Sequence, residues 1–154
     1  MTIVELQDLV YNELSELFKD YTLRAADGNT TTAIKVYKQD LPIPESDDDS
    51  EETPPFLIVR ISDGEQSDWE ESHTVNVAVI ICVWDDARER QGARDVLSII
   101  TRIHQKMMKH PALNGAFEMP FKWTLNDEDT FPYYYGACQF TMTASAVRRE
   151  NPLA

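Results

Sequence analysis

Histidines placed near carboxylates are the residues of this sequence whose types best suit metal binding or acid–base chemistry. Glu70, Glu71 and His73 lie close together, and carboxylate oxygens and imidazole nitrogens are common zinc ligands. The segment around them is polar, so we interpret all three as solvated surface groups and expect no metal site there. His104 and His110 are six residues apart in a predicted helix, so their side chains point to different sides and cannot share an ion.

A run of acidic residues from 45 to 52 is the next candidate, because calcium prefers oxygen ligands. Six of its eight residues are carboxylates. The run lacks the alternating ligand spacing and the central glycine of an EF-hand loop, so tight calcium binding is not expected. We instead treat Asp47, Asp48 and Asp49 as candidates for a protein interface.

Nucleophilic and nucleotide chemistry have no recognisable motif in the chain. Neither a Gly-x-Ser-x-Gly elbow nor a phosphate-binding glycine pattern occurs among the five glycines. Cys82 and Cys138 match no metal or redox spacing, and we predict that both are buried free thiols. We therefore predict a protein that is not an enzyme and has no cofactor. Carboxylates that only folding brings together keep an enzyme as an open alternative.

The charge balance argues against a protein that grips nucleic acid. The net charge is −13, whereas proteins hold a nucleic-acid backbone with Lys and Arg. Removing the six carboxylates of the acidic run from the 27 acidic residues leaves 21, against 14 basic residues. The rest of the chain is therefore acidic as well, and its clearest group of cations is Arg88, Arg90 and Arg94.

The hydropathy pattern predicts neither a membrane span nor a secretory signal. The longest apolar run, 75–83, is broken by Asn76 and is far shorter than the roughly 20 residues that a spanning helix needs. The start of the chain lacks the basic residues and the continuous apolar stretch of a signal peptide. We expect no membrane partner and residence in the cytoplasm.

Aromatic residues supply two further candidates for contacts with a partner. Trp69 is the one large apolar side chain in a polar segment, outside any strong periodic pattern. Tyr133, Tyr134 and Tyr135 follow one another where the chain enters a predicted strand, and successive side chains of a strand point to opposite faces. At least one of these tyrosines is therefore expected to be available to a partner, since tyrosine is enriched in interfaces.

Residues 2–21 are predicted to form the first helix, because apolar side chains recur at steps of three or four positions. Thr2 and Glu5 have the spacing of a capping box at its start. The turn-forming residues at 25–29 are expected to end this helix.

Apolar runs predict five strands, and a second amphipathic stretch predicts another helix. The predicted strands cover residues 31–38, 56–61, 73–84, 117–125 and 135–147, and the second helix covers residues 86–110. The strand 73–84 is apolar on both faces, so we expect it at the centre of a sheet. Asp86 and Glu89 have capping-box spacing at the start of the second helix, whose side chains Ala93, Val96 and Leu97 are expected to face inward.

These elements predict an α+β fold in a single domain of residues 1–154. The expected architecture is a mixed or antiparallel sheet of about five strands packed with two helices, in the order α-β-β-β-α-β-β. The segment 39–55 combines prolines with the acidic run and is predicted to be a mobile loop. Residues 148–154 are predicted to be a short polar tail.

The order of these elements and several short motifs together resemble the tail-terminator and tail-completion proteins of long-tailed bacteriophages. The motifs are the capped first helix, the strand 56–61 followed by Asp63-Gly64-Glu65, the strand 75–84, and the segments 92–97, 110–115 and 129–136. The resemblance covers most of the chain, and the Asp-rich insertion at 45–52 is not part of it.

The resemblance implies a structural protein of the virion that forms a ring, commonly hexameric, on the head-proximal end of the tail tube. Such a ring ends tail polymerisation and joins the tail to the head. The implied partners are further copies of the chain, the tail tube protein and the head-tail connector protein. DNA is expected to pass through an acidic lumen without specific binding, because like charges repel.

A ring uses two different complementary patches on each subunit, and each patch contacts the next copy around the axis. We therefore expect Arg88, Arg90 and Arg94 to lie opposite the acidic run of a neighbouring subunit. Two alternatives stay open. Another head-tail joining or minor capsid component would have the same composition, and a small acidic binding or inhibitor protein would be a monomer that captures a basic partner.

Overall fold

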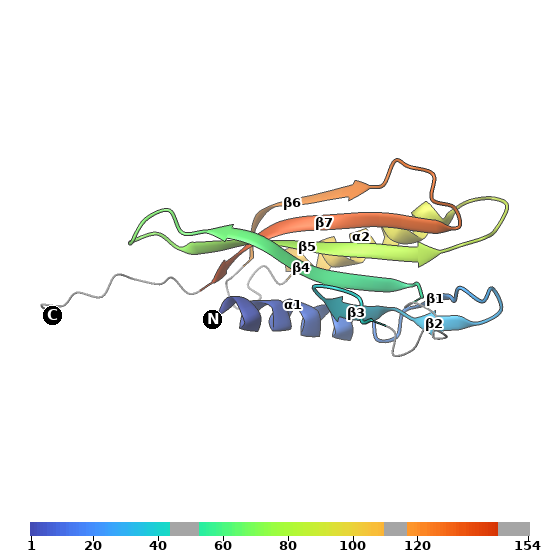
Figure 1. The fold of residues 1–154 in the computed structure, drawn as a ribbon, viewed down its shortest axis with the longest axis horizontal. Coiled ribbons are helices and arrows are strands. Elements are labelled where there is room, and N and C mark those ends of the chain that lie inside the picture. The colour runs from blue at the N-terminus through green and yellow to red at the C-terminus, as the bar shows by residue number, and fades with distance from the viewer. Residues whose placement is uncertain (44–52, 110–116, 145–154) are drawn as a thin grey trace, which may run out of the picture.

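The computed structural model describes residues 1–43, 53–109 and 117–144 of the 154-residue chain. Its elements in chain order are helix α1 (Ile3–Leu17), strands β1 (Thr22–Arg24), β2 (Thr31–Ala33), β3 (Lys35–Lys38), β4 (Phe56–Glu65) and β5 (His73–Trp84), helix α2 (Gly92–Lys109), and strands β6 (Phe117–Leu125) and β7 (Tyr133–Ala144) (Figure 1). The predicted α+β fold is therefore confirmed. None of the helices in these described ranges is long and apolar enough to cross a membrane.

Five of the strands form one mixed sheet in the order β3-β4-β5-β7-β6. β3 runs parallel to β4, and all other neighbours are antiparallel. β5 lies at the centre, as its apolar residues on both faces predicted. β1 and β2 pair only with each other, in a separate two-stranded sheet.

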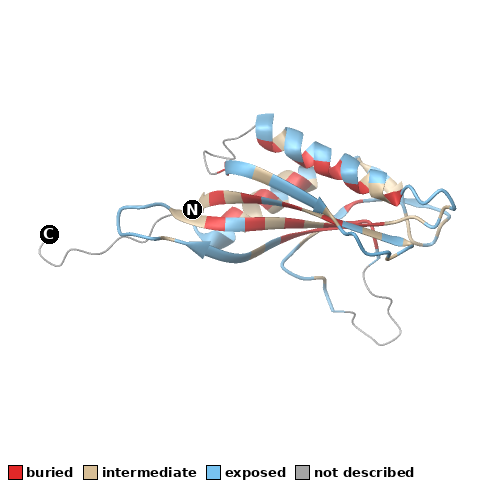
Figure 2. Ribbon diagram, turned by 90° about the horizontal axis from the view of Figure 1, so that it is seen from above, coloured by how far each residue is buried: buried red, intermediate tan, exposed pale blue. Residues whose placement is uncertain are grey.

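Both helices cover the same face of the sheet and enclose the main core. Alternate residues of β5 from Val75 to Val83 are buried there, together with side chains from both helices and from β4 and β7. The helical side chains of this core are Leu6, Val10 and Leu14 of α1 and Val96, Ile99, Ile103 and Met107 of α2. The Lys106 ammonium is 3.0 Å from the Glu13 carboxylate, which links the two helices. Figure 2 shows the buried residues gathered between helices and sheet.

The first helix begins as predicted but ends earlier. Thr2 caps it, and the capping box with Glu5 is present. The helix ends at Leu17 instead of continuing to residue 21, because the chain turns at the buried Phe18 and enters β1 at Thr22. The predicted turn at 25–29 is present, but it connects β1 to β2 and does not end the helix.

The predicted strand 31–38 is wrong in one respect, because it is divided at the buried residue Ile34. Its first half pairs with β1 and its second half with β4, so two different partners split one β-branched run.

Gln39 extends the pairing beyond β3: its side-chain amide donates to the Ile61 carbonyl at 3.0 Å and accepts from the Ile61 N–H at 2.8 Å. β4 continues to Glu65 where the sequence predicted an end at residue 61, because the long strand β5 pairs with it throughout.

The second helix begins at Gly92 and not at residue 86. The Asp85 side chain accepts a hydrogen bond from the Ala87 N–H at 2.9 Å, and the segment before the helix turns through Arg90 with a positive φ of 53°. This local turn satisfies backbone donors that a helix start would otherwise expose, so the capping-box spacing at 86–89 is not used. The last strand starts at Tyr133, two residues before the predicted start.

The predicted mobile loop is described only at its two ends. Leu41 packs against the buried residues Phe56, Ile58 and Cys82 on the face of the sheet opposite the helices. Pro54 and Pro55 are buried. Residues 45–52, including the acidic run, and the predicted tail 148–154 lie outside the described residues.

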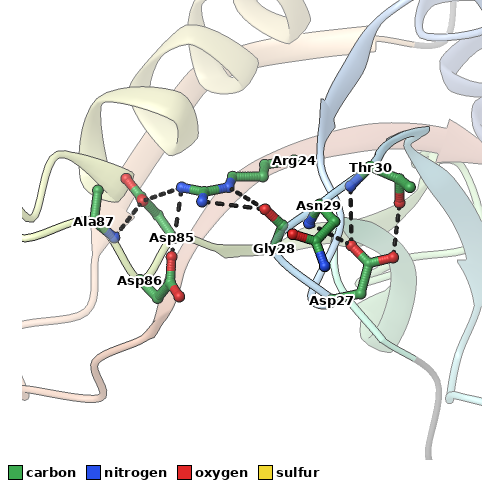
Figure 3. A network of polar contacts seen from close by, with 8 residues as sticks. All are labelled: Arg24, Asp27, Gly28, Asn29, Thr30, Asp85, Asp86 and Ala87. Atoms are coloured by element: carbon green, nitrogen blue, oxygen red, sulfur yellow. Dashed lines mark hydrogen bonds and ion pairs between the residues drawn. The ribbon is translucent and has the colours of Figure 1, made fainter.

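A network of polar contacts fixes the β1–β2 hairpin to the end of β5 (Figure 3). The Arg24 guanidinium donates to the Gly28 carbonyl, lies 3.4 Å from the Asp86 carboxylate, and sits over the Trp84 ring at 5.8 Å. Asp27 accepts hydrogen bonds from the backbone of Asn29 and Thr30 and from the Thr30 hydroxyl, and these bonds lower the pKa of the Asp27 carboxyl.

Replacing Gly28 by Ala should loosen this hairpin. Gly28 has a φ of +77°, and an added Cβ would lie 3.4 Å from the Trp84 ring. A left-handed conformation costs an L-residue roughly 1–2 kcal/mol, which corresponds to a fall in melting temperature of about 2–8 °C in a chain of this size. Thermal unfolding followed by circular dichroism measures the change.

Asn29→Ala is the matched control for Gly28→Ala, because Asn29 contributes only its backbone N–H to the contact with Asp27. Its melting temperature should stay close to that of the unmodified protein. Equal stability of the two variants would contradict the role assigned to Gly28.

Candidate interaction surfaces

An acidic arm is the most prominent surface feature of the described chain. We use this name for residues 62–72, the end of β4 and the turn that leads to β5. Figures 1 and 2 show its tip projecting past both helices along the long axis of the molecule. The arm carries five carboxylates and no Lys or Arg: Asp63, Glu65, Asp68, Glu70 and Glu71.

Trp69 lies at the tip of the acidic arm and is 56% exposed. Its backbone N–H donates to the Asp68 carboxylate at 2.6 Å. An indole is a large apolar group that is enriched in interfaces, so its exposure among carboxylates fits the predicted contact residue. Contact with a partner stays a prediction.

Side-chain hydrogen bonds hold the base of the acidic arm in a fixed direction. The Asn76 amide donates to the Asp63 carboxylate at 3.1 Å and accepts from the Thr141 hydroxyl at 3.2 Å. The Thr74 hydroxyl donates to the Glu65 carbonyl at 3.2 Å. These bonds join β4, β5 and β7, so the arm extends from the sheet as an ordered ribbon.

A basic groove runs along the outer side of α2, beside the end of α1. It has a volume of about 750 Å³, is open to solvent, and is lined by Tyr21, Arg94, Leu97, Ser98, Thr101, Arg102 and Gln105. A smaller hollow continues it past Lys106 and Lys109. α2 holds four cations and one acid, Asp95, a balance of +3 in a chain whose net charge is −13.

Two details of the basic groove differ from the sequence prediction or go beyond it. Leu97 was predicted to face inward, but it is 36% exposed and lines the groove. The Arg102 guanidinium lies 4.5 Å from the centroid of the Tyr21 ring, a contact that orients the cation at the junction of the two helices. Sequence reasoning missed Arg102, although its four-residue step from Lys106 on the helix could have indicated a shared face.

The opposite end of the sheet brings together residues that the sequence treated as separate candidates. Arg90 forms an ion pair with Asp129 at 2.5 Å, and its guanidinium lies 5.1 Å from the centroid of the Phe131 ring. The Tyr134 hydroxyl and the Asp129 carboxylate raise the pKa of Arg90. The loop after β5 and the loop before β7 are therefore joined through Arg90.

The three tyrosines face different ways, as predicted. Tyr134 points toward the start of α2 at Gly92. Tyr133 and Tyr135 are 40% and 37% exposed, and Phe131 beside them is 43% exposed. We call Phe131, Tyr133 and Tyr135 the aromatic end of the molecule; it is a third exposed surface, besides the acidic arm and the basic groove.

The remaining predicted interface residues are placed as follows. Arg88 is exposed in the loop before α2, whereas Arg94 lies in the basic groove. The three arginines therefore serve different surfaces and do not form one patch. Asp47, Asp48 and Asp49 lie outside the described residues, so their pairing with the arginines stays a prediction.

The described residues include no group of three His, Cys, Asp or Glu side chains that could hold a metal ion. Burial and the charge of Asp85 raise the pKa of Asp95, and the fold thus places two carboxyls near each other. Asp85 already accepts from Ala87 and faces Arg24, and neither carboxyl lines the basic groove.

No protein-family model matches this chain, and no curated protein is significantly similar to it.

The two thiols should be unreactive in the folded protein. Cys82 and Cys138 are buried and free, as predicted, and burial raises the pKa of each to about 12. At pH 8 the folded chain should hold about a thousandfold less thiolate than an unfolded one, so Ellman's reagent should react slowly before denaturation and count two thiols after it. One fast thiol in the native protein would contradict the burial.

The same thiols give stability a pH dependence. The unfolded chain releases these protons from about pH 9, whereas the folded chain keeps them up to about pH 12. Stability should therefore fall as the pH rises through this window.

Gly92→Ala should disturb the aromatic end. A Cβ at this position would overlap the ring of Tyr134, so the start of α2 and β7 would have to separate. Overpacking of this kind costs about 1–3 kcal/mol, which urea unfolding can measure. Ser98→Ala, an exposed position of the same helix, is the control and should have little effect. A Gly92→Ala variant as stable as the control would disprove the close contact.

Proposed function

We propose that this chain is a structural protein of a tailed bacteriophage that forms a ring at the head-proximal end of the tail tube. In this role it ends tail polymerisation, joins the tail to the head connector, and resides in the virion. The first support is that the sequence motifs resemble those of tail-terminator and tail-completion proteins. The observation on the folded chain that supports it best is the presence of unlike, separated surfaces on one subunit.

These surfaces match the requirements of a ring subunit. A heterologous interface needs two different complementary patches, and the chain offers an acidic arm and a basic groove. A joining protein also needs a surface for partners of another kind. The aromatic end, which lies at the other end of the sheet from the arm, supplies exposed tyrosine area suited to that purpose (Figure 1).

The charge of the chain suits passage of DNA. A ring of subunits that each carry −13 repels phosphates unless cations gather on the lumen side. If the cations of α2 are used between subunits, the surface left for the lumen is acidic. DNA would then cross the ring without adhering, and the proposed partners are the tube protein and the connector protein.

Light scattering over a wide concentration range, with negative-stain imaging of the same sample, tests this proposal. We expect one closed oligomer with a central hole, or a monomer that binds one end of tail tubes made from the tube protein of the same genome. A compact two-fold dimer would contradict it, because a two-fold interface uses the same patch on both copies. A monomer that leaves tube ends unoccupied would favour the alternative of a small acidic binding protein.

A further inference from the structure

We infer that the acidic arm of one copy docks into the basic groove of the neighbouring copy and that this contact builds the oligomer. The inference rests on the proposed ring and names its subunit interface. It commits to a second copy of this chain as the occupant of the groove.

Charge complementarity is the first argument. The arm holds five carboxylates without a compensating cation, and α2 holds Arg94, Arg102, Lys106 and Lys109 against one acid. Lys106 is engaged with Glu13, whereas Arg94 and Arg102 are exposed along the groove. Opposite potentials steer two surfaces together and fix their register, and here both surfaces belong to the same chain.

Reach is the second argument. The tip of the arm lies beyond both helices at one end of the molecule, whereas α2 begins at the other end (Figures 1 and 2). The hydrogen bonds of Asn76 keep the base of the arm aligned with the sheet. Within one copy the arm therefore cannot reach Arg94, and contact between the arm and this part of the groove requires a second copy.

Side-chain chemistry is the third argument. The groove combines cations with Tyr21 and the exposed Leu97, and the arm combines carboxylates with the exposed Trp69. An indole at this position can cover Leu97 while an arginine guanidinium lies over its face. Apolar contact at the centre with charge pairs around it is the usual composition of a protein interface.

The contact has a direction, because the arm and the groove are different surfaces on different parts of the chain. Each copy then uses its arm toward one neighbour and its groove toward the other. Repetition of such a contact gives a ring when the rotation closes. The aromatic end takes no part in it and stays available to the tube or the connector.

Charge reversal on each surface tests the contact. The groove variant is Arg94→Glu with Arg102→Glu, and the arm variant is Glu70→Lys with Glu71→Lys. Each variant alone should lose self-association, with a dissociation constant raised tenfold or more, because like charges then face each other. Sedimentation at 50 mM and 500 mM NaCl measures this dissociation constant. For the unmodified protein it should be larger at the higher salt concentration, because salt screens the charges.

Mixing the two variants gives the decisive result. In an equimolar mixture the arm variant presents a basic arm to the acidic groove of the other copy, and the unmodified arm and groove also face each other. Alternating oligomers should therefore re-form. The quadruple variant, with both surfaces reversed in one chain, should also assemble.

Matched controls keep the number of charge changes equal. Lys19→Glu with Lys122→Glu reverses two exposed cations outside the groove, and Asp127→Lys with Glu128→Lys reverses two exposed acids outside the arm. Both controls should assemble as the unmodified protein does. Circular dichroism confirms that every variant is folded.

Disulfide trapping gives a readout that does not depend on stable rings. Ser67 in the arm and Ser98 in the groove are exposed, and the native thiols are buried. A chain with Ser67→Cys and Ser98→Cys should form a ladder of intermolecular disulfides at high concentration, whereas either substitution alone should give none beyond dimers.

The outcomes separate this inference from the proposed function. Rings that persist in both charge-reversed variants would overturn the arm-to-groove contact and leave the ring itself standing. A disulfide ladder without closed rings would support the contact and count against the ring. The inference is overturned if the mixed variants do not re-assemble and no disulfide ladder forms. It is also overturned if the unmodified protein binds duplex DNA in a salt-dependent way and the groove variant loses this binding but still self-associates.

Discussion

The burial of β5 beneath two helices is the contact on which the rest of the structure depends. Its alternate valines and isoleucine from Val75 to Val83 are almost completely buried in a core that also holds side chains of α1 and α2. Full burial of such a side chain is worth about 1.5–3 kcal/mol, so this row is a large part of the core. β4 and β7 both pair along the strand, and a slip of one residue would turn the whole row to the other face.

The acidic arm follows from the length of the same strand. β5 keeps its pairing with β4 as far as Glu65 and Thr74, whereas β3 pairs only with the first part of β4. Past that point hydrogen bonds among Asp63, Asn76 and Thr141 join β4, β5 and β7 on the side chains that point away from the core. β5 therefore buries alternate residues from Val75 onward, and its first residues pair with the part of β4 that leads into the exposed, charged arm.

The surface charge of α2 has a related origin. Its inner side chains, such as Ile99 and Ile103, must face the sheet, and this places Arg94 and Arg102 on the solvent side. A basic stripe on an otherwise acidic chain attracts acidic surfaces, and the arm is such a surface. The separation of arm, groove and aromatic end on one chain is what the proposed ring, with a tube protein and a connector protein as neighbours, would require.

The sequence by itself determined the elements with strong periodicity. The central strand 73–84, the helix cap at Thr2 and Glu5, the strand 117–125, the buried thiols and the opposite directions of the three tyrosines were all predictable, because each depends on local spacing or composition. Exposure of Trp69 followed from the polar residues around it.

Only the tertiary structure decided where segments divide and which surfaces meet. The run 31–38 splits between two sheets, and α2 starts at Gly92, since pairing partners and a turn far from helical geometry override local propensity. Arg90 forms an ion pair with Asp129, and Tyr21 lines the basic groove together with residues of α2. In both cases the residues are distant in the chain. Such contacts depend on how the helices and strands pack in space, and spacing along one sequence does not encode that packing directly.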